Sequence, residues 1–168
     1  MKKIAVLIIL LISSTVFFGQ NSTNETLEKI ITKVADTVTG DMGRWQFAIN
    51  DRMLICITDE NNNRMRIMSP ITELENLTEK EILNALVANF HTALDVKYAV
   101  SDEIIWSVFI HPLKELQEPQ IEDAIKQVYS AAATFGSIYS STNLSFPGNT
   151  QKVEKESTSP KQLKLQKG

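Results

Sequence analysis

The two histidines and one aspartate are the residues whose types and spacing could support chemistry. His91 and Asp95 are four residues apart, which would place their side chains next to each other on a helix, and His111 ends an apolar segment. A histidine beside a carboxylate can act as a general base, and three such groups could bind a metal ion. The chain supplies no nucleophile, phosphate-binding loop or second closely spaced ligand pair to complete either site. We therefore predict no catalytic, metal-binding or cofactor-binding residues. A small metal-dependent or hydrolytic enzyme that uses these three side chains is the alternative.

The chain also lacks the partner residues that cysteine chemistry would need. Cys56 is the only cysteine, so the chain has no internal disulfide. It lies in the apolar segment 52–58, where a small buried side chain fits well. We interpret it as a packing residue.

Hydrophobic periodicity predicts the elements that come before these residues. Apolar residues spaced by three and four predict a helix that stops at Gly40, with the stripe Leu27, Ile30, Ile31, Val34 and Val38. From Trp45 onward, apolar and polar residues alternate, which predicts a meander of three strands near 44–50, 53–58 and 64–68, ended by Pro70. The polar run 59–63 lacks the ligand spacing of a calcium loop and is interpreted as a solvated hairpin tip.

The second half of the chain is predicted as a helix, a hairpin and a final helix. Thr78 and Glu81 have the spacing of a capping box. The apolar face of the helix that follows consists of Ile82, Leu83, Leu86, Val87, Phe90 and Leu94. Because Lys97 would fall in the middle of that face, the helix is expected to end near Asp95. Strands are then predicted near 96–100 and 104–111, with a last helix from about Pro119 to residue 140.

The last predicted strand is apolar on both faces. Trp106, Val108 and Ile110 alternate with Ile105, Phe109 and His111. Such a strand is usually covered on both sides, so three helices on one face of the sheet would leave the other face for a partner. We therefore predict a homodimer that forms through the outer face of this strand. The candidate partner-binding residues are Trp106, Val108, Ile110, Phe109, His111 and His91.

These elements follow the order α-β-β-β-α-β-β-α, which predicts an α+β domain with one antiparallel five-stranded sheet and three helices. The segments MRIMSPI (65–71), ANFHTALD (88–95) and WSVFIHPL (106–113) resemble the YbjN / type III secretion (Tir) chaperone-like family. The resemblance covers roughly residues 27–140. It implies a type III secretion chaperone-like fold and a small acidic homodimer that binds partner proteins without enzymatic turnover.

The two ends of the chain differ from the domain between them. Lys2 and Lys3 precede an uncharged apolar run, 4–18, which is typical of a secretory signal peptide and is shorter than the ~20 residues that a membrane-spanning helix needs. We predict a signal peptide at 1–19, a single domain at 20–140 and a disordered polar, basic tail at 141–168. An uncleaved N-terminal anchor is the alternative. The protein is then exported, periplasmic or secreted, with no stable membrane span after cleavage.

The charge distribution excludes one class of partner. Residues 20–140 contain 10 Lys or Arg and 18 Asp or Glu, a net charge of −8, whereas the tail has a net charge of +3. An acidic domain is a poor surface for nucleic acid, because phosphate binding needs clustered positive charge. We predict an exported, non-catalytic protein-binding or chaperone-like module. A small-ligand carrier, with a pocket between sheet and helices, is a further alternative.

Overall fold

The computed structural model describes residues 21–144, which form one antiparallel sheet and the helices around it. The elements are α2 (Asn24–Val34), β1 (Thr37–Asp41), β2 (Arg44–Ile49), β3 (Arg52–Asp59), β4 (Arg64–Glu73), the 3₁₀ turn η1 (Leu74–Asn76), α3 (Glu79–His91), β5 (Lys97–Ser101), β6 (Ile104–His111) and α4 (Glu118–Thr134). The predicted signal peptide and the tail beyond residue 144 lie outside the described residues. Within 21–144, no helix is long and apolar enough to cross a membrane.

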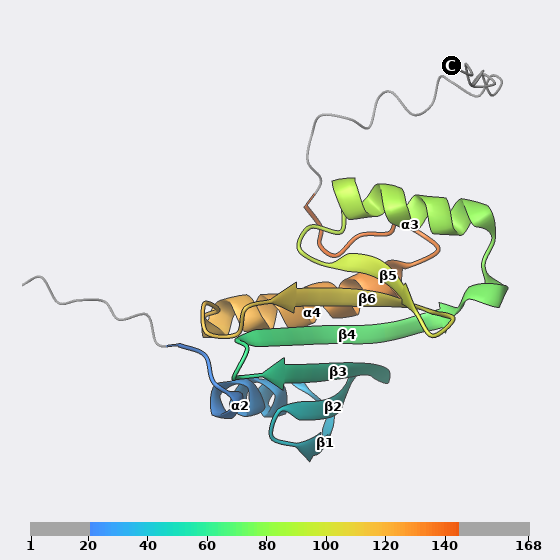
Figure 1. Ribbon diagram of the computed structural model, residues 1–168. Coiled ribbons are helices and arrows are strands. Elements are labelled where there is room, and N and C mark those ends of the chain that lie inside the picture. Colours follow the sequence, from blue (N-terminus) through green and yellow to red (C-terminus); the bar gives the residue numbers. More distant parts are fainter. Residues whose placement is uncertain (1–20, 145–168) are drawn as a thin grey trace, which may run out of the picture.

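The strands have the order β1-β2-β3-β4-β6-β5. Strands β1 to β4 form a meander, and the chain then passes through η1 and α3 before it returns as the β5–β6 hairpin, with β6 against β4. Helices α2 and α4 lie behind the sheet in the view of Figure 1, and α3 lies beyond the β5 edge. The α+β class is as predicted, and one face of the sheet carries no helix among the described elements.

The predicted number of strands is wrong, because the sheet has six strands and not five. The extra strand is β1, which was predicted as the end of the first helix. Helix α2 stops at Val34, and Val38 pairs with Phe47 in the sheet. Asp36 stabilises this change of direction, since its backbone N–H donates to Ala48 O and its carboxylate accepts from the backbone N–H of Asn50. A β-branched valine suits a strand better than a helix, and pairing with β2 decides between them.

Strand β4 is longer than predicted. Pro70 was expected to end it, but the strand continues to Glu73. The register with β6 shifts between Pro70 and Thr72, and the registered pairs of β3 with β4 reach only to Met68. Proline is tolerated at such irregular places because the missing N–H interrupts no regular ladder.

The core lies between the sheet and the two helices behind it. It is formed by alternate residues of the strands, with α2 and α4 opposite: Leu27, Ile30, Ile31, Trp45, Phe47, Leu54, Cys56, Met65, Ile67, Ile105, Phe109, Ile121, Ile125 and Val128. Cys56 is fully buried, and burial raises the pKa of its thiol to about 12, because the thiolate is poorly solvated there. Its predicted packing role is confirmed.

Helix α3 begins at the predicted capping box. Thr78 Oγ1 accepts from the backbone N–H of Glu81, and the Glu81 carboxylate accepts from the backbone N–H of Thr78 at 2.8 Å. The backbone N–H and the hydroxyl of Thr78 both donate to the Glu81 carboxylate, and these two hydrogen bonds hold its pKa below its ordinary value. The side of α3 that was predicted to face the core is wrong, however. The helix buries Ala85 and Ala88 and turns the large apolar residues toward solvent.

Asn89 joins α3 to the edge of the sheet. Its side-chain amide accepts from Tyr98 N at 2.7 Å and donates to Tyr98 O at 3.1 Å, so it imitates the next strand of the ladder. Asn89→Ala leaves both backbone groups unpaired and should cost about 1–3 kcal/mol of unfolding free energy. Amide hydrogen exchange in 79–91 should then be faster.

The matched control is Asn84→Ala, an exposed asparagine on the same helix. It should change stability by no more than about 0.5 kcal/mol. Equal exchange rates in the Asn89 and Asn84 variants would show that the Asn89 hydrogen bonds do not hold α3 in place.

Candidate functional site

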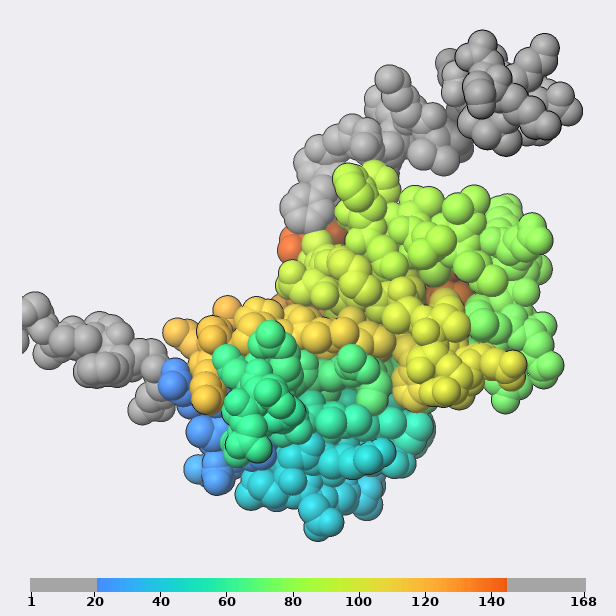
Figure 2. Space-filling view, in the orientation of Figure 1, coloured from blue at the N-terminus to red at the C-terminus, as the bar shows by residue number. Residues whose placement is uncertain are grey.

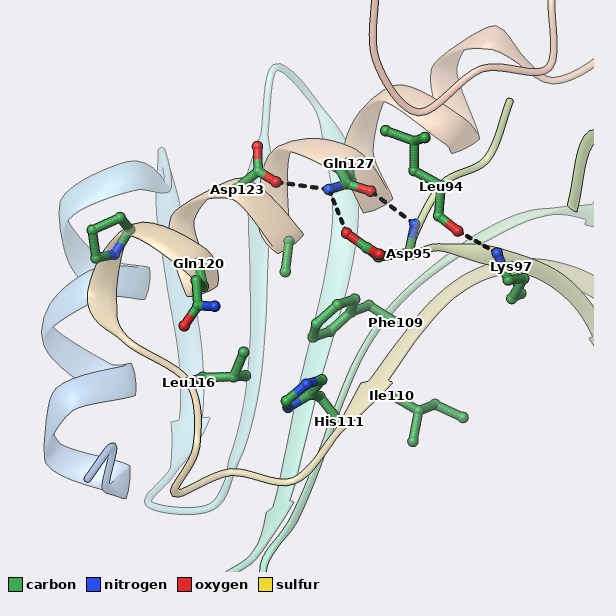
Figure 3. Close-up of a pocket in the computed structure, with 12 residues that line it drawn as sticks. Leu94, Asp95, Lys97, Phe109, Ile110, His111, Leu116, Gln120, Asp123 and Gln127 are labelled. Atoms are coloured by element: carbon green, nitrogen blue, oxygen red, sulfur yellow. Dashed lines mark hydrogen bonds between the residues drawn. The ribbon is translucent and has the colours of Figure 1, made fainter. Parts of the chain in front are cut away.

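The three side chains that could support catalysis or metal binding, His91, Asp95 and His111, do not form one site. Asp95 and His111 line the same cleft (Figure 3), whereas His91 is not among the residues that line it. The predicted pair of His91 and Asp95 is wrong, because α3 ends at His91 and the chain then turns, with Leu94 at a positive φ of 49°. His91 packs edge-on against the ring of Phe90, with the ring centres 4.8 Å apart.

The cleft has a volume of ≈ 610 Å³ and lies between β6, α4 and the turn at 94–97. The rings of His111 and Phe109 stack within it (Figure 3). His111 Nδ1 lies 2.8 Å from Pro112 O. Gln127 connects the two carboxylates: its Nε2 donates to Asp123 at 2.7 Å and to Asp95 at 3.3 Å. Its Oε1 accepts from the backbone N–H of Asp95.

This arrangement braces α4 against the turn at 94–97 and provides no nucleophile beside a base. Of these side chains only Gln127 is buried, and its hydrogen bonds to the exposed Asp95 and Asp123 satisfy its amide, as expected of a structural contact. Among residues 21–144, no three His, Cys, Asp or Glu side chains are grouped so that they could hold a metal ion.

The predicted partner-binding residues divide between the two faces of β6. Phe109 points into the core and His111 lies half-buried beside it in the cleft, while His91 is on α3. Trp106, Val108 and Ile110 alternate with the core residues and point away from the helices.

We call the surface around these three residues the outer face. Its apolar residues from β3, β4 and β6 are Met53, Ile55, Ile57, Met68, Pro70, Trp106, Val108 and Ile110. The register brings them together, because Met68 pairs with Val108 and Ile55 pairs with Met68. Figure 2 views the molecule from this side, with the strands in front of α2 and α4.

Side chains on the outer face shield one another only in part. Ile110 is 58% exposed, and Val108 is nearly buried between its neighbours. Trp106 is held in position by a hydrogen bond from its indole N–H to Ser101 O at 3.2 Å. A continuous apolar area of this kind on a sheet is characteristic of an interaction surface.

A second exposed apolar surface lies on α3, and the sequence interpretation missed it. We call it the α3 stripe: Leu83, Leu86, Val87 and Phe90, which follow the three-and-four spacing of one helix side. Phe90 is 85% exposed, although these residues were predicted to face the core. The small residues Ala85 and Ala88, which share the other side of the helix with Asn89, could have revealed this orientation. Small residues allow a helix to approach a strand edge closely.

Comparisons with known proteins identify the fold and no closer relationship. No family model matches the chain, and no curated protein matches it significantly. The solved structures that are similar include two chaperone complexes. One is the Yersinia pestis type III secretion chaperone SycH in complex with a fragment of YscM2, with 13% identity and a TM-score of 0.52 over 67% of this chain and 98% of that one. The other is from the HopA1–SchA chaperone-effector complex, with 10% identity and a TM-score of 0.51 over 67% and 94%.

The chain therefore has the fold of type III secretion chaperones, as the resemblance predicted. At these identities the similarity concerns the fold alone. The finer resemblance to YbjN proteins stays a prediction, since neither structure is described as one.

Proposed function

We propose that this protein is a non-catalytic, chaperone-like module that binds a partner protein on its outer face. The observation that carries this proposal is the continuous apolar surface of β3, β4 and β6, which no described helix covers. The fold supports it, because the two similar structures named above are described as complexes of a chaperone with another protein. In the cleft of Figure 3, Asp95, Gln127 and Asp123 are engaged with one another, and this contact favours neither the enzyme nor the small-ligand carrier.

Two copies of the protein associate through the α3 stripe in this proposal. The stripe carries four large apolar side chains and no charge, and its spacing is that of a helix seam. An identical stripe related by a twofold axis is its natural complement, because an isologous interface places the same patch on both copies. The dimer interface is thus assigned to α3, and the outer face of β6 remains free for the partner.

In this proposal, the protein binds its partner outside the cytoplasm. Support comes from residues 1–18, where two lysines precede an uncharged apolar run. Mass spectrometry of the protein recovered from fractionated cells tests this. A chain that starts near residue 20 in the exported fraction is expected, and an intact chain in the cytoplasm would contradict export.

Site-specific photo-crosslinking in the native cells tests partner binding. A benzoylphenylalanine residue at Ile110, or at Met53 on the same face, should capture one and the same partner protein. The control position is Lys126, which is exposed on α4 on the other side of the sheet. Capture from all three positions alike, or from none, would contradict binding on the outer face.

A further inference from the structure

Arginine is concentrated on the outer face. The chain has four arginines, all within residues 44–66, and three of them have side chains on this face: Arg44, Arg64 and Arg66. The fourth, Arg52, has the opposite parity at the start of β3. One row across the sheet reads Arg44, Ile57, Arg66 and Ile110, because each residue pairs in register with the next. Cations and apolar side chains therefore alternate over four strands.

In the described part of the chain, 21–144, these guanidinium groups form no ion pair with a carboxylate. Among residues 21–144, the ion pairs are those of Lys33 with Glu118 and Glu122, so no arginine of the outer face takes part in one. Of the carboxylates near the row, Asp59 is engaged by the backbone and side-chain N–H groups of Asn62. Asp41 pairs in register with Arg44 but forms no ion pair with it.

The opposite end of the sheet is acidic. Glu73, Glu75, Asp102 and Glu103 surround a hollow of ≈ 400 Å³ where β4 ends and the β5–β6 hairpin turns. At the arginine end, a hollow of ≈ 240 Å³ has Ile57 and Ile110 in its lining together with Arg64 and Arg66. The face is thus polarised along the strands, so a charged segment bound to it has one preferred direction.

The remaining parts of this chain do not complement the arginines. Residues 1–20 contain Lys2 and Lys3 and no acidic residue, and residues 145–168 contain five lysines and two glutamates. Neither segment supplies a net negative charge. An occupant with a net negative charge must therefore come from another molecule.

We infer that the outer face binds an acidic, apolar-rich segment of the partner protein, with carboxylates on Arg44 and Arg66 and apolar side chains on Ile57 and Ile110. The inference rests on the proposed function and specifies its partner. Arginine suits this task because its planar guanidinium binds a carboxylate through two parallel hydrogen bonds and packs on apolar surface with its stem. The acidic end of the sheet repels the same carboxylates and so sets the direction of the segment.

Selection from a random peptide library displayed on phage tests the inference with the full chain. Peptides enriched on the wild-type protein should contain more Asp and Glu next to apolar residues than the starting library. They should bind the double variant Arg44→Glu/Arg66→Glu at least about tenfold more weakly, because two attractions become repulsions. Arg52→Glu is the matched control and should bind them as the wild type does.

Each other outcome overturns the inference. Enriched peptides without excess carboxylate, failure to enrich any peptide, or an equal loss in Arg52→Glu would all contradict an acidic partner. Light scattering that shows a dimeric wild type and a monomeric double variant would identify a second copy as the occupant. If crosslinking from Ile110 still captures a partner protein in these cases, the proposed function stands and only the acidic chemistry of the partner is wrong.

Discussion

Replacing Leu86 and Phe90 together by aspartate is expected to convert the proposed dimer into a monomer. Both side chains are exposed in the single copy, so the change costs the fold little, whereas a dimer would have to bury the new carboxylates at its centre. Losing two apolar anchors per copy should raise the dimer dissociation constant by at least about 100-fold. Light scattering at micromolar concentration measures the change, and circular dichroism checks the fold.

Ile110→Asp is the matched control on the other apolar surface. Ile110 is about as exposed as Leu86, but it lies on the outer face and not on α3. This variant should remain a dimer. The opposite result, a monomer with Ile110→Asp and a dimer with the α3 substitutions, would return the interface to the outer face of β6. A wild-type monomer would exclude the proposed dimer altogether.

Replacing Gly40 by alanine is expected to destabilise the domain by about 2–5 kcal/mol. Gly40 lies in β1 with a φ of 105°, a conformation that L side chains rarely adopt. A Cβ atom there would overlap the backbone carbonyl of Arg44, which cannot move away because Gly40 and Trp45 are paired in the sheet. Urea unfolding followed by tryptophan fluorescence measures the loss, since Trp45 is buried in the core.

The Gly136→Ala variant separates the cost of a positive φ from the cost of the clash with the Arg44 carbonyl. Gly136 also has a positive φ, 79°, but a Cβ atom there meets nothing within 4 Å. It should therefore show the conformational cost alone, about 1 kcal/mol. Equal losses in the two variants would mean that the clash with Arg44 is relieved by a shift of β1.

Local patterns in the sequence were sufficient for most of the elements. The Thr78–Glu81 capping box places the start of α3, and the apolar run from Ile104 to His111 defines β6. Both signals depend on neighbours within a few residues. Val38 shows where such signals fail, because it continues a helical stripe and also suits a strand. Only pairing with Phe47, nine residues away, makes it part of β1.

The candidate site was predictable to a similar extent. The two-sided apolar character of β6 indicated an uncovered surface, and Trp106, Val108 and Ile110 do point away from the helices. The predicted link between His91, Asp95 and His111 failed, because the chain turns after His91 and His91 packs on Phe90. The arginine row could not be seen in the sequence, since Arg44 and Ile110 belong to strands far apart in the chain.

The sequence by itself determined which residues share a side of each element, because side-chain direction repeats every two residues in a strand and every 3.6 in a helix. The tertiary structure alone decided which side meets the core. Helix α3 lies beyond the β5 edge, where Asn89 bonds to Tyr98 and the small side of the helix fits. Its large apolar side therefore faces solvent. In the same way, only the register of β2, β3, β4 and β6 joins Arg44, Ile57, Arg66 and Ile110 into one surface for a partner.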